Sequence, residues 1–200
     1  MTTIEAIRKR RSIRKYKKDS IPEEVILELL DAARLAPSGC NAQPWRFRVV
    51  KDIDTKLQLA QAAYNQKFIS EAPVVLVVCA NIKQYLDKSV SGIHDLGKIG
   101  AVKNEIVKII EDRVEKLRYL KVREIGPLIA VNVAIAVEHI VLRALDFDLG
   151  TCWVRLFDWQ KVKEIFNWDD DIYVVALLPI GYPDESPEQR KRLTLQEIMI

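Results

Sequence analysis

The residues near the start of the chain that could bind an anion are Arg10, Ser12 and Arg14, with Arg11 between them. Guanidinium groups offer paired donors to phosphate oxygens, and a serine hydroxyl adds a donor on a short arm. This cluster directly follows a predicted helix at 2–10, so it indicates a phosphate site. The alternatives are a solvated basic face, which is what charge runs usually are, or a nucleic-acid contact.

A second candidate site is the polar loop between a predicted helix and a predicted strand. It contains Pro37, Ser38, Gly39, Asn41 and Gln43. Fixed side-chain amides and exposed backbone N–H groups suit a planar polar ligand. A rigid turn whose amides cap the preceding helix end is an equal alternative.

Other polar or reactive residues are scattered. Asn65 and Gln66 precede an apolar strand, and Asn65 could instead form a helix C-cap. Cys152 lies in an apolar segment with no histidine nearby in sequence, so we expect a packed core residue rather than a nucleophile. Arg190 and Arg192 form a second basic cluster. The three aspartates at 169–171 are expected to be solvated, not to bind a metal.

Composition limits the class of protein. Two hundred residues, 49% of them hydrophobic and 30% charged, predict one soluble globular domain spanning 1–200. Three separated cysteines and two histidines argue against a disulfide framework, a zinc site or a histidine metal site, so no metal is expected. The start of the chain lacks the apolar core of a signal peptide, and we expect a reducing cytoplasm.

The basic charge is local. The net charge is +3, yet eight of the 31 Lys and Arg residues lie within 8–18, which leaves 23 bases against 28 acids, or −5, for the rest of the chain. That negative remainder would oppose a polyanion, and no aromatic residue except Tyr16 is interleaved with the bases. A local anion site is therefore favoured over nucleic-acid binding.

The pattern of apolar residues predicts the elements that position these groups. We expect strands at 46–50, 73–79, 151–154 and 172–180, and helices at 2–10, from a cap at Ser20 to before 36–39, at 54–64, 102–119, 127–145 and 160–166. Helices and strands do not alternate strictly, so an α+β fold is favoured over a doubly wound one. Residues 81–126 are expected to leave the core.

The helix predicted at 127–145 is apolar on nearly every side. It also carries Asn132, Glu138, His139 and Arg143, which would be expensive in a bilayer. We therefore expect a core helix and no membrane contact. A 200-residue monomer would leave part of such a helix exposed, which favours a homodimer.

Several well-known signatures are absent. The chain has no GxGxxG, GxxxxGK[ST], GxSxG or HExxH motif. Any nicotinamide reductant must therefore bind without a Rossmann fingerprint.

Taken in order, four segments resemble the nitroreductase family of FMN-dependent oxidoreductases. They are RRSIRKY at 10–16, the 36–47 segment with its QPW, the stretch 134–153 ending in GTCW, and LPIGYP at 178–183 followed by Arg190 and Arg192. The resemblance covers almost the whole chain. It implies an α+β fold with a central, mostly antiparallel sheet flanked by helices. It also implies an intertwined homodimer with two FMN molecules at the interface.

The resemblance also implies roles for residues. Arg10, Ser12 and Arg14 would hold the FMN phosphate, joined by Arg190 or Arg192, with Arg11 in the same motif. Pro37, Ser38, Gly39, Asn41 and Gln43 belong to the loop that would approach the flavin from the partner subunit. Asn65 or Gln66 would address the flavin ring, and Cys152, Trp153, Val154 and Arg155 would lie along its edge. The flavin N5 carries the chemistry, so no catalytic side chain is expected.

The function implied is ping-pong hydride transfer from NAD(P)H to a nitroaromatic, quinone or similar acceptor. A flavin-dependent dehalogenase or a flavin-fragmenting enzyme of the same fold is the alternative. The chain departs from many relatives at Arg155, where they carry glycine. This arginine could crowd the flavin, select an anionic substrate, or turn outward and pair with an acid such as Asp158. Residues 81–126 match nothing specific, which leaves the substrate open.

Overall fold

The computed structural model describes residues 1–200 and contains one four-stranded sheet. The strands are β1 (Trp45–Val50), β2 (Val74–Asn81), β3 (Gly150–Thr151) and β4 (Ile172–Gly181), in the order β1-β2-β4-β3. All three pairings are antiparallel, which confirms the expected α+β class. The strand predicted at 151–154 is shorter than expected, because after β3 only an isolated bridge joins Val154 to Leu177 of β4.

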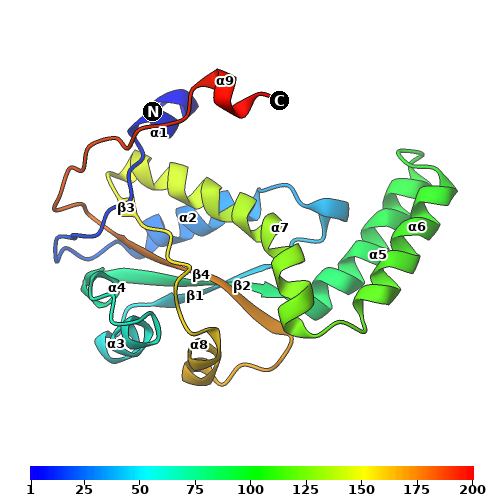
Figure 1. Ribbon diagram of the computed structural model, residues 1–200, viewed down its shortest axis with the longest axis horizontal. Coiled ribbons are helices and arrows are strands. Elements are labelled where there is room, and N and C mark those ends of the chain that lie inside the picture. The colour runs from blue at the N-terminus through cyan, green and yellow to red at the C-terminus, as the bar shows by residue number, and fades with distance from the viewer.

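Helices cover both faces of the sheet. They are α1 (Thr3–Lys9), α2 (Glu23–Arg34), α3 (Ile53–Ala62), α4 (Phe68–Glu71), α5 (Ile82–Lys98), α6 (Asn104–Leu117), α7 (Val122–Arg143), α8 (Trp159–Phe166) and α9 (Leu195–Ile198), with short 3₁₀ turns η1 (Gly39–Asn41) and η2 (Ala144–Phe147). In Figure 1, α2 and α7 lie on one face of the sheet and α3, α4 and α8 on the other. The α5–α6 pair projects from one end as a hairpin.

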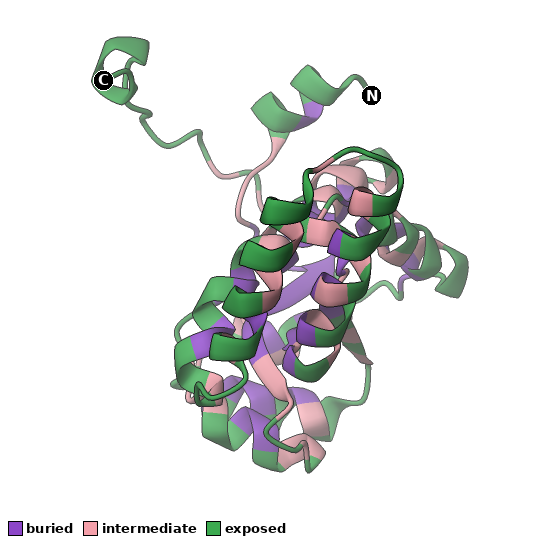
Figure 2. Cartoon of the chain, turned by 90° about the vertical axis from the view of Figure 1, so that its right-hand side faces the viewer, coloured by how far each residue is buried: buried purple, intermediate pink, exposed green.

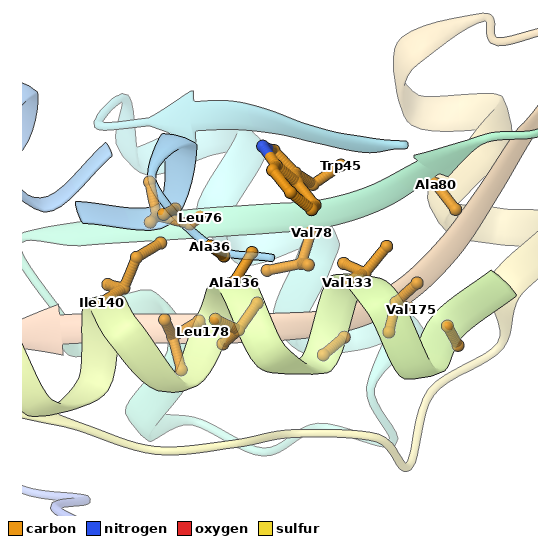
Figure 3. Packing of buried hydrophobic residues seen from close by; sticks show 14 of the residues in the cluster. Ala36, Trp45, Leu76, Val78, Ala80, Val133, Ala136, Ile140, Val175 and Leu178 are labelled. Carbon is orange, nitrogen blue, oxygen red and sulfur yellow. The ribbon is translucent and has the colours of Figure 1, made fainter. Parts of the chain in front are cut away.

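The main core lies between α7 and the sheet. Figure 3 shows Val133, Ala136 and Ile140 of α7 facing Leu76 and Leu178 of the central strands. Each fully buried aliphatic side chain of this kind contributes about 1.5–3 kcal/mol. Strand β2 is buried along its length except at Asn81, because helices cover both of its faces, as its unbroken apolar run predicts.

The central helix begins earlier than predicted. We expected it to start at Pro127, but α7 starts at Val122 and includes that proline. The Glu124 carboxylate accepts a hydrogen bond from the Lys121 backbone N–H at 2.8 Å, which closes the first turn. The expectation of a Ser20 cap for α2 is also wrong. The N-cap is Pro22, and no side chain caps the helix. The negative charges of two glutamates in the first turn interact favourably with the positive end of the helix dipole.

By length and composition the stretch Val122–Phe147 could cross a membrane, but half of its apolar window is buried in the fold. Helix α7 is therefore a core helix here, as expected. Its outer side nevertheless exposes Leu128, Val131 and Ile135, which retain 52%, 64% and 39% of their accessible surface. We call these three residues the α7 stripe.

The excursion at 81–126 is a helical hairpin. The charged helix expected near 102–119 is confirmed as α6, while α5 was not predicted. A hydrogen bond between His94 and Glu111 at 2.8 Å and an ion pair between Arg118 and Asp87 at 2.9 Å link the two helices.

At the other end of the chain, Figure 2 shows the segment that follows the last strand extending away from the body.

Candidate functional site

The segment 10–14 runs beside β3. The Ile13 N–H donates to the Thr151 carbonyl at 3.0 Å, and Ser12 forms a parallel bridge with Thr151. A Cβ atom at Gly150 would lie 2.5 Å from the Ile13 side chain, so only glycine permits this close approach. The predicted phosphate-binding residues are thereby fixed against the edge strand.

Two of the predicted anion-binding residues place positive charge near Cys152. Burial raises the pKa of the Cys152 thiol and the Glu185 charge adds to this, while the Arg14 and Arg10 charges act in the opposite direction. The thiol is 2% exposed, as expected for a packed core residue rather than a nucleophile. Arg10, Ser12 and Arg14 therefore form one basic cluster on the segment that pairs with β3, beside the buried Cys152.

The guanidinium groups of this cluster have no carboxylate partner. Glu185 lies close, yet its carboxylate accepts hydrogen bonds from the backbone N–H groups of Arg14 and Lys15, the latter at 3.1 Å. No ion pair involves Arg10 or Arg14. Positive charge thus remains available for an external anion, next to a cavity of about 250 Å³ between 9–13 and 183–187.

Arg11 behaves differently from its neighbours. Its guanidinium donates to the carbonyls of Arg8 at 2.7 Å and Arg10 at 2.9 Å. These bonds satisfy carbonyl groups at the end of α1, where a cation is also favoured by the helix dipole. Arg11 therefore lines the cavity while it caps the helix.

The amide pair at 65–66 flanks the segment that follows β3. The Gln66 side-chain amide donates to the carbonyls of Ala63 at 2.9 Å and Leu156 at 3.0 Å, which ties the turn to that segment. Asn65 adopts a left-handed conformation with φ 61°, and its N–H donates to the Ala60 carbonyl at 2.9 Å. The C-cap of α3 is Ala63, so the alternative that Asn65 forms the C-cap is wrong. The exposed Asn65 side-chain amide makes no hydrogen bond. Asn65, rather than Gln66, is thus the amide free to meet a ligand.

Residues Cys152, Trp153, Val154 and Arg155 run along the same edge. Val154 exchanges two 2.9 Å backbone hydrogen bonds with Leu177. The guanidinium of Arg14 lies 5.9 Å from the ring centre of Phe68, so the cluster also faces the start of α4. One protomer therefore brings together Arg10, Ser12 and Arg14 with Asn65 and the 152–155 segment.

Arg155 is exposed and forms no ion pair. The alternative that it pairs with Asp158 is wrong, because the Asp158 carboxylate caps α8. That carboxylate accepts the backbone N–H groups of Gln160 at 3.0 Å and Lys161 at 3.3 Å. Arg155 is therefore an unpaired cation at the end of the edge segment.

The loop 37–43 lies elsewhere, beside the middle of α7 and against α5 (Figure 1). The Gly39 N–H donates to the Asn132 side chain at 2.9 Å, and the Gln43 amide donates to the Asn41 side chain at 2.9 Å. The residues Cys40, Asn41 and Gln43 all have positive φ, so the loop is held in a conformation that L residues seldom adopt. Pro37, Gly39 and Asn41 remain exposed. The predicted site residues thus form two groups within one protomer.

The C-terminal basic pair belongs to neither group. Arg190 and Arg192 are exposed, and the Arg192 guanidinium reaches only the carbonyls of Arg190 at 3.1 Å and Lys191 at 3.4 Å. The arm that carries them extends away from the body (Figure 2). Sequence reasoning also missed Glu185 and Asn132, which orient the two groups and carry no local motif.

Comparison with known proteins gives consistent matches over nearly the whole chain. The family profile described as the nitroreductase family matches residues 7–182. A Thermus thermophilus protein named NADH dehydrogenase is 33% identical, with 96% of this chain and 92% of the relative covered. A Thermotoga neapolitana protein named iodotyrosine deiodinase is 28% identical, with 89% and 87% covered. A solved structure from Exiguobacterium sibiricum in complex with FMN matches with a TM-score of 0.79 at 25% identity, covering 100% of this chain and 97% of that one.

Proposed function

Because the chain belongs to the nitroreductase family, we propose that it is an FMN-dependent oxidoreductase that takes reducing equivalents from NAD(P)H. The observation that carries the proposal is that Arg10 and Arg14, which flank Ser12 on the segment paired with β3, have no carboxylate partner. The similar structure in complex with FMN supports FMN as the cofactor, and the relative named NADH dehydrogenase supports a nicotinamide as the reductant.

The residues present fit the phosphate of FMN. Two guanidinium groups without carboxylate partners and a serine hydroxyl form a donor set that suits a dianionic phosphate. Gly150 keeps the backbone of β3 close to this donor set. When bound, FMN would supply the hydride and electron-transfer chemistry between the reductant and the acceptor.

The rest of the edge positions the ring. The free amide of Asn65 offers both a donor and an acceptor to a pyrimidine edge. The 152–155 segment borders the ring, and its backbone bonds to Leu177 hold it in place. No general acid or base is assigned to the chain, because the hydride steps take place on the cofactor.

The second group of site residues reaches the flavin from a partner subunit in a homodimer. The α7 stripe adjoins Asn132, which holds Gly39, so a contact across this face would carry loop 37–43 to the other protomer. The C-terminal arm also exposes apolar side chains, with Leu193 at 65%, Leu195 at 72% and Met199 at 74%. Exposed apolar surface of this kind marks an interface, and pairing would bury it. The arm would bring Arg190 or Arg192 to a phosphate.

The basic segment 8–18 thus serves a phosphate and not a nucleic acid, and we place the enzyme in the cytoplasm, away from membranes. Nitroaromatics and quinones are the acceptors we propose. Dehalogenation is the alternative, favoured by the relative named iodotyrosine deiodinase.

The test is the visible spectrum of the purified protein. Flavin bands that bleach under NADH or NADPH without oxygen are expected, and nitrobenzene or menadione should restore them. A colourless protein that retains no FMN after incubation with FMN and removal of the unbound cofactor by gel filtration would reject the proposal. Recovery with 3-iodotyrosine and release of iodide, but no recovery with nitrobenzene or menadione, would establish the alternative.

A further inference from the structure

A second basic pocket lies directly beyond the segment that borders the proposed flavin site. Its volume is about 330 Å³, and its lining is Arg123, Arg155, Phe157, Trp159, Tyr173 and the adjacent valines of β4. Two cations and three aromatic rings thus share one small cavity, and no acidic residue lines it. Neither the phosphate cluster nor loop 37–43 contributes to it.

The fold opens this pocket by ending a strand pairing. The edge segment pairs with β4 as far as Val154 and Leu177. It then turns away, because the Asp158 N–H donates to the Ala62 carbonyl at 2.8 Å and α8 begins. The edge of β4 at 173–175 is left without a strand partner on this side. The first turns of α7 form the opposite wall, where Gly126 packs so closely against Tyr173 that a Cβ atom would overlap its ring.

The arginines in the pocket are free to bind an anion. The Arg123 guanidinium lies 4.4 Å from the ring centre of Trp159, which fixes it by a cation–π contact. Neither Arg123 nor Arg155 has an ion-pair partner. Two of the nearby acids are engaged, since Asp158 caps α8 and Asp170 pairs with Lys163 at 2.6 Å. Asp171 lines the neighbouring cavity, which Arg123 and Trp159 also line, and it forms no ion pair with Arg123.

The chemistry of the lining identifies the ligand. A guanidinium group binds a carboxylate through two parallel hydrogen bonds in one plane, and aromatic side chains pack against a planar ring. The volume lies at the lower end for ligand pockets and suits a single ring. We propose that Arg123 and Arg155 form a subsite for the carboxylate of an aromatic electron acceptor. This inference rests on the proposed function, because the subsite selects the acceptor only if the flavin lies along 152–155.

The experiment is isothermal titration calorimetry of the oxidised holoenzyme with 4-nitrobenzoate and with neutral 4-nitrobenzamide. The parent should bind the carboxylate about tenfold more tightly than the amide, since a charge-assisted hydrogen bond is worth about that factor. Arg123→Gln should remove most of this preference and leave the affinity for the amide unchanged. Arg123→Lys should retain part of it, because the charge stays while the planar fork is lost.

The matched control is Lys108→Gln, which removes one exposed positive charge from α6, outside the pocket. It should keep the full preference. Equal affinity for the two ligands in the parent, or equal losses in Arg123→Gln and Lys108→Gln, would overturn the subsite. The same variants are also titrated with 2′,5′-ADP, a probe for the phosphates of NADPH. If Arg123→Gln weakens the binding of 2′,5′-ADP but not that of 4-nitrobenzoate, the assignment to a carboxylate is overturned. Calorimetry measures ligand affinity without turnover. The carboxylate preference can therefore be determined even if the protein does not oxidise NAD(P)H.

Discussion

Gly92 of α5 lies so close to Cys40 that a Cβ atom at position 92 would overlap the Cys40 carbonyl group. The loop 37–43 therefore packs against α5 at a position where only glycine leaves room for its backbone. The close contact matters because Cys40 has a positive φ of 51°, a conformation that an L residue seldom adopts.

We expect Gly92→Ala to displace the loop. Alanine improves an exposed helix by about 1 kcal/mol over glycine, but overpacking costs about 1–3 kcal/mol, toward the upper end against backbone. The free energy of unfolding in urea should therefore fall by about 1–2 kcal/mol, and FMN affinity should fall with it. Gly97→Ala is the matched control, since its Cβ would meet only a methyl of Val107 at 3.0 Å. Equal stability of the two variants would contradict the role of Gly92.

Arg14→Ala should weaken FMN binding. Loss of one charge-assisted hydrogen bond to a phosphate costs about 1.5–3 kcal/mol, which is roughly tenfold or more in affinity. Fluorescence quenching of FMN measures the dissociation constant. Lys18→Ala removes a nearby exposed charge and should change it little. An unchanged constant for Arg14→Ala would remove Arg14 from the phosphate site.

The chain should run as a dimer of about twice 23.0 kDa in light scattering at micromolar concentration. Val131→Glu places a charge in the α7 stripe and should yield a monomer that has lost most of its FMN, because burying an unpaired charge is expensive. Leu57→Glu changes an equally apolar residue on α3 that is 46% exposed, and it should remain dimeric. A monomer that still binds FMN tightly would refute the shared site.

Arg155→Gly should lower the two-electron midpoint potential of the bound flavin. An unpaired cation near the ring favours the anionic reduced form, so its removal destabilises that form. The expected shift is tens of millivolts, where ~30 mV corresponds to about 1.4 kcal/mol for two electrons. Redox titration against the parent measures it. An identical midpoint would mean that Arg155 does not act on the flavin.

The three cysteines should differ in reactivity. Burial raises the pKa of each thiol, but Cys79 and Cys152 are 2% exposed whereas Cys40 is partly accessible. A raised pKa lowers the thiolate fraction at neutral pH, so labelling of Cys40 should be slow and should rise about tenfold per pH unit up to above pH 9. Mass spectrometry after iodoacetamide treatment should find Cys40 alone modified in the native protein. Modification of Cys152 at a similar rate would contradict its burial.

The sequence predicts the framework better than the site. The continuous apolar runs of β2 and β4 identify buried strands because water-excluded strands need no polar face. The start of α7 could not be located, since Pro127 is a strong helix breaker by propensity, whereas the helix begins five residues before it, at Val122. The choice between Asn65 and Gln66 depends on the Leu156 carbonyl, 90 residues away from Gln66. The separation of loop 37–43 from Arg10 is likewise a tertiary fact that no local pattern encodes.

The two-residue length of β3 has a consequence for motion. β2 lies between two long partners, so its amide hydrogens should exchange with solvent only when the whole domain unfolds. β3 has only two register pairs with β4 and one bridge to Ser12, and its amides should exchange through local opening. The edge beside the proposed flavin site should therefore open before the rest of the sheet unfolds. A ligand that binds only the closed form of this edge should slow the exchange of the β3 amide hydrogens.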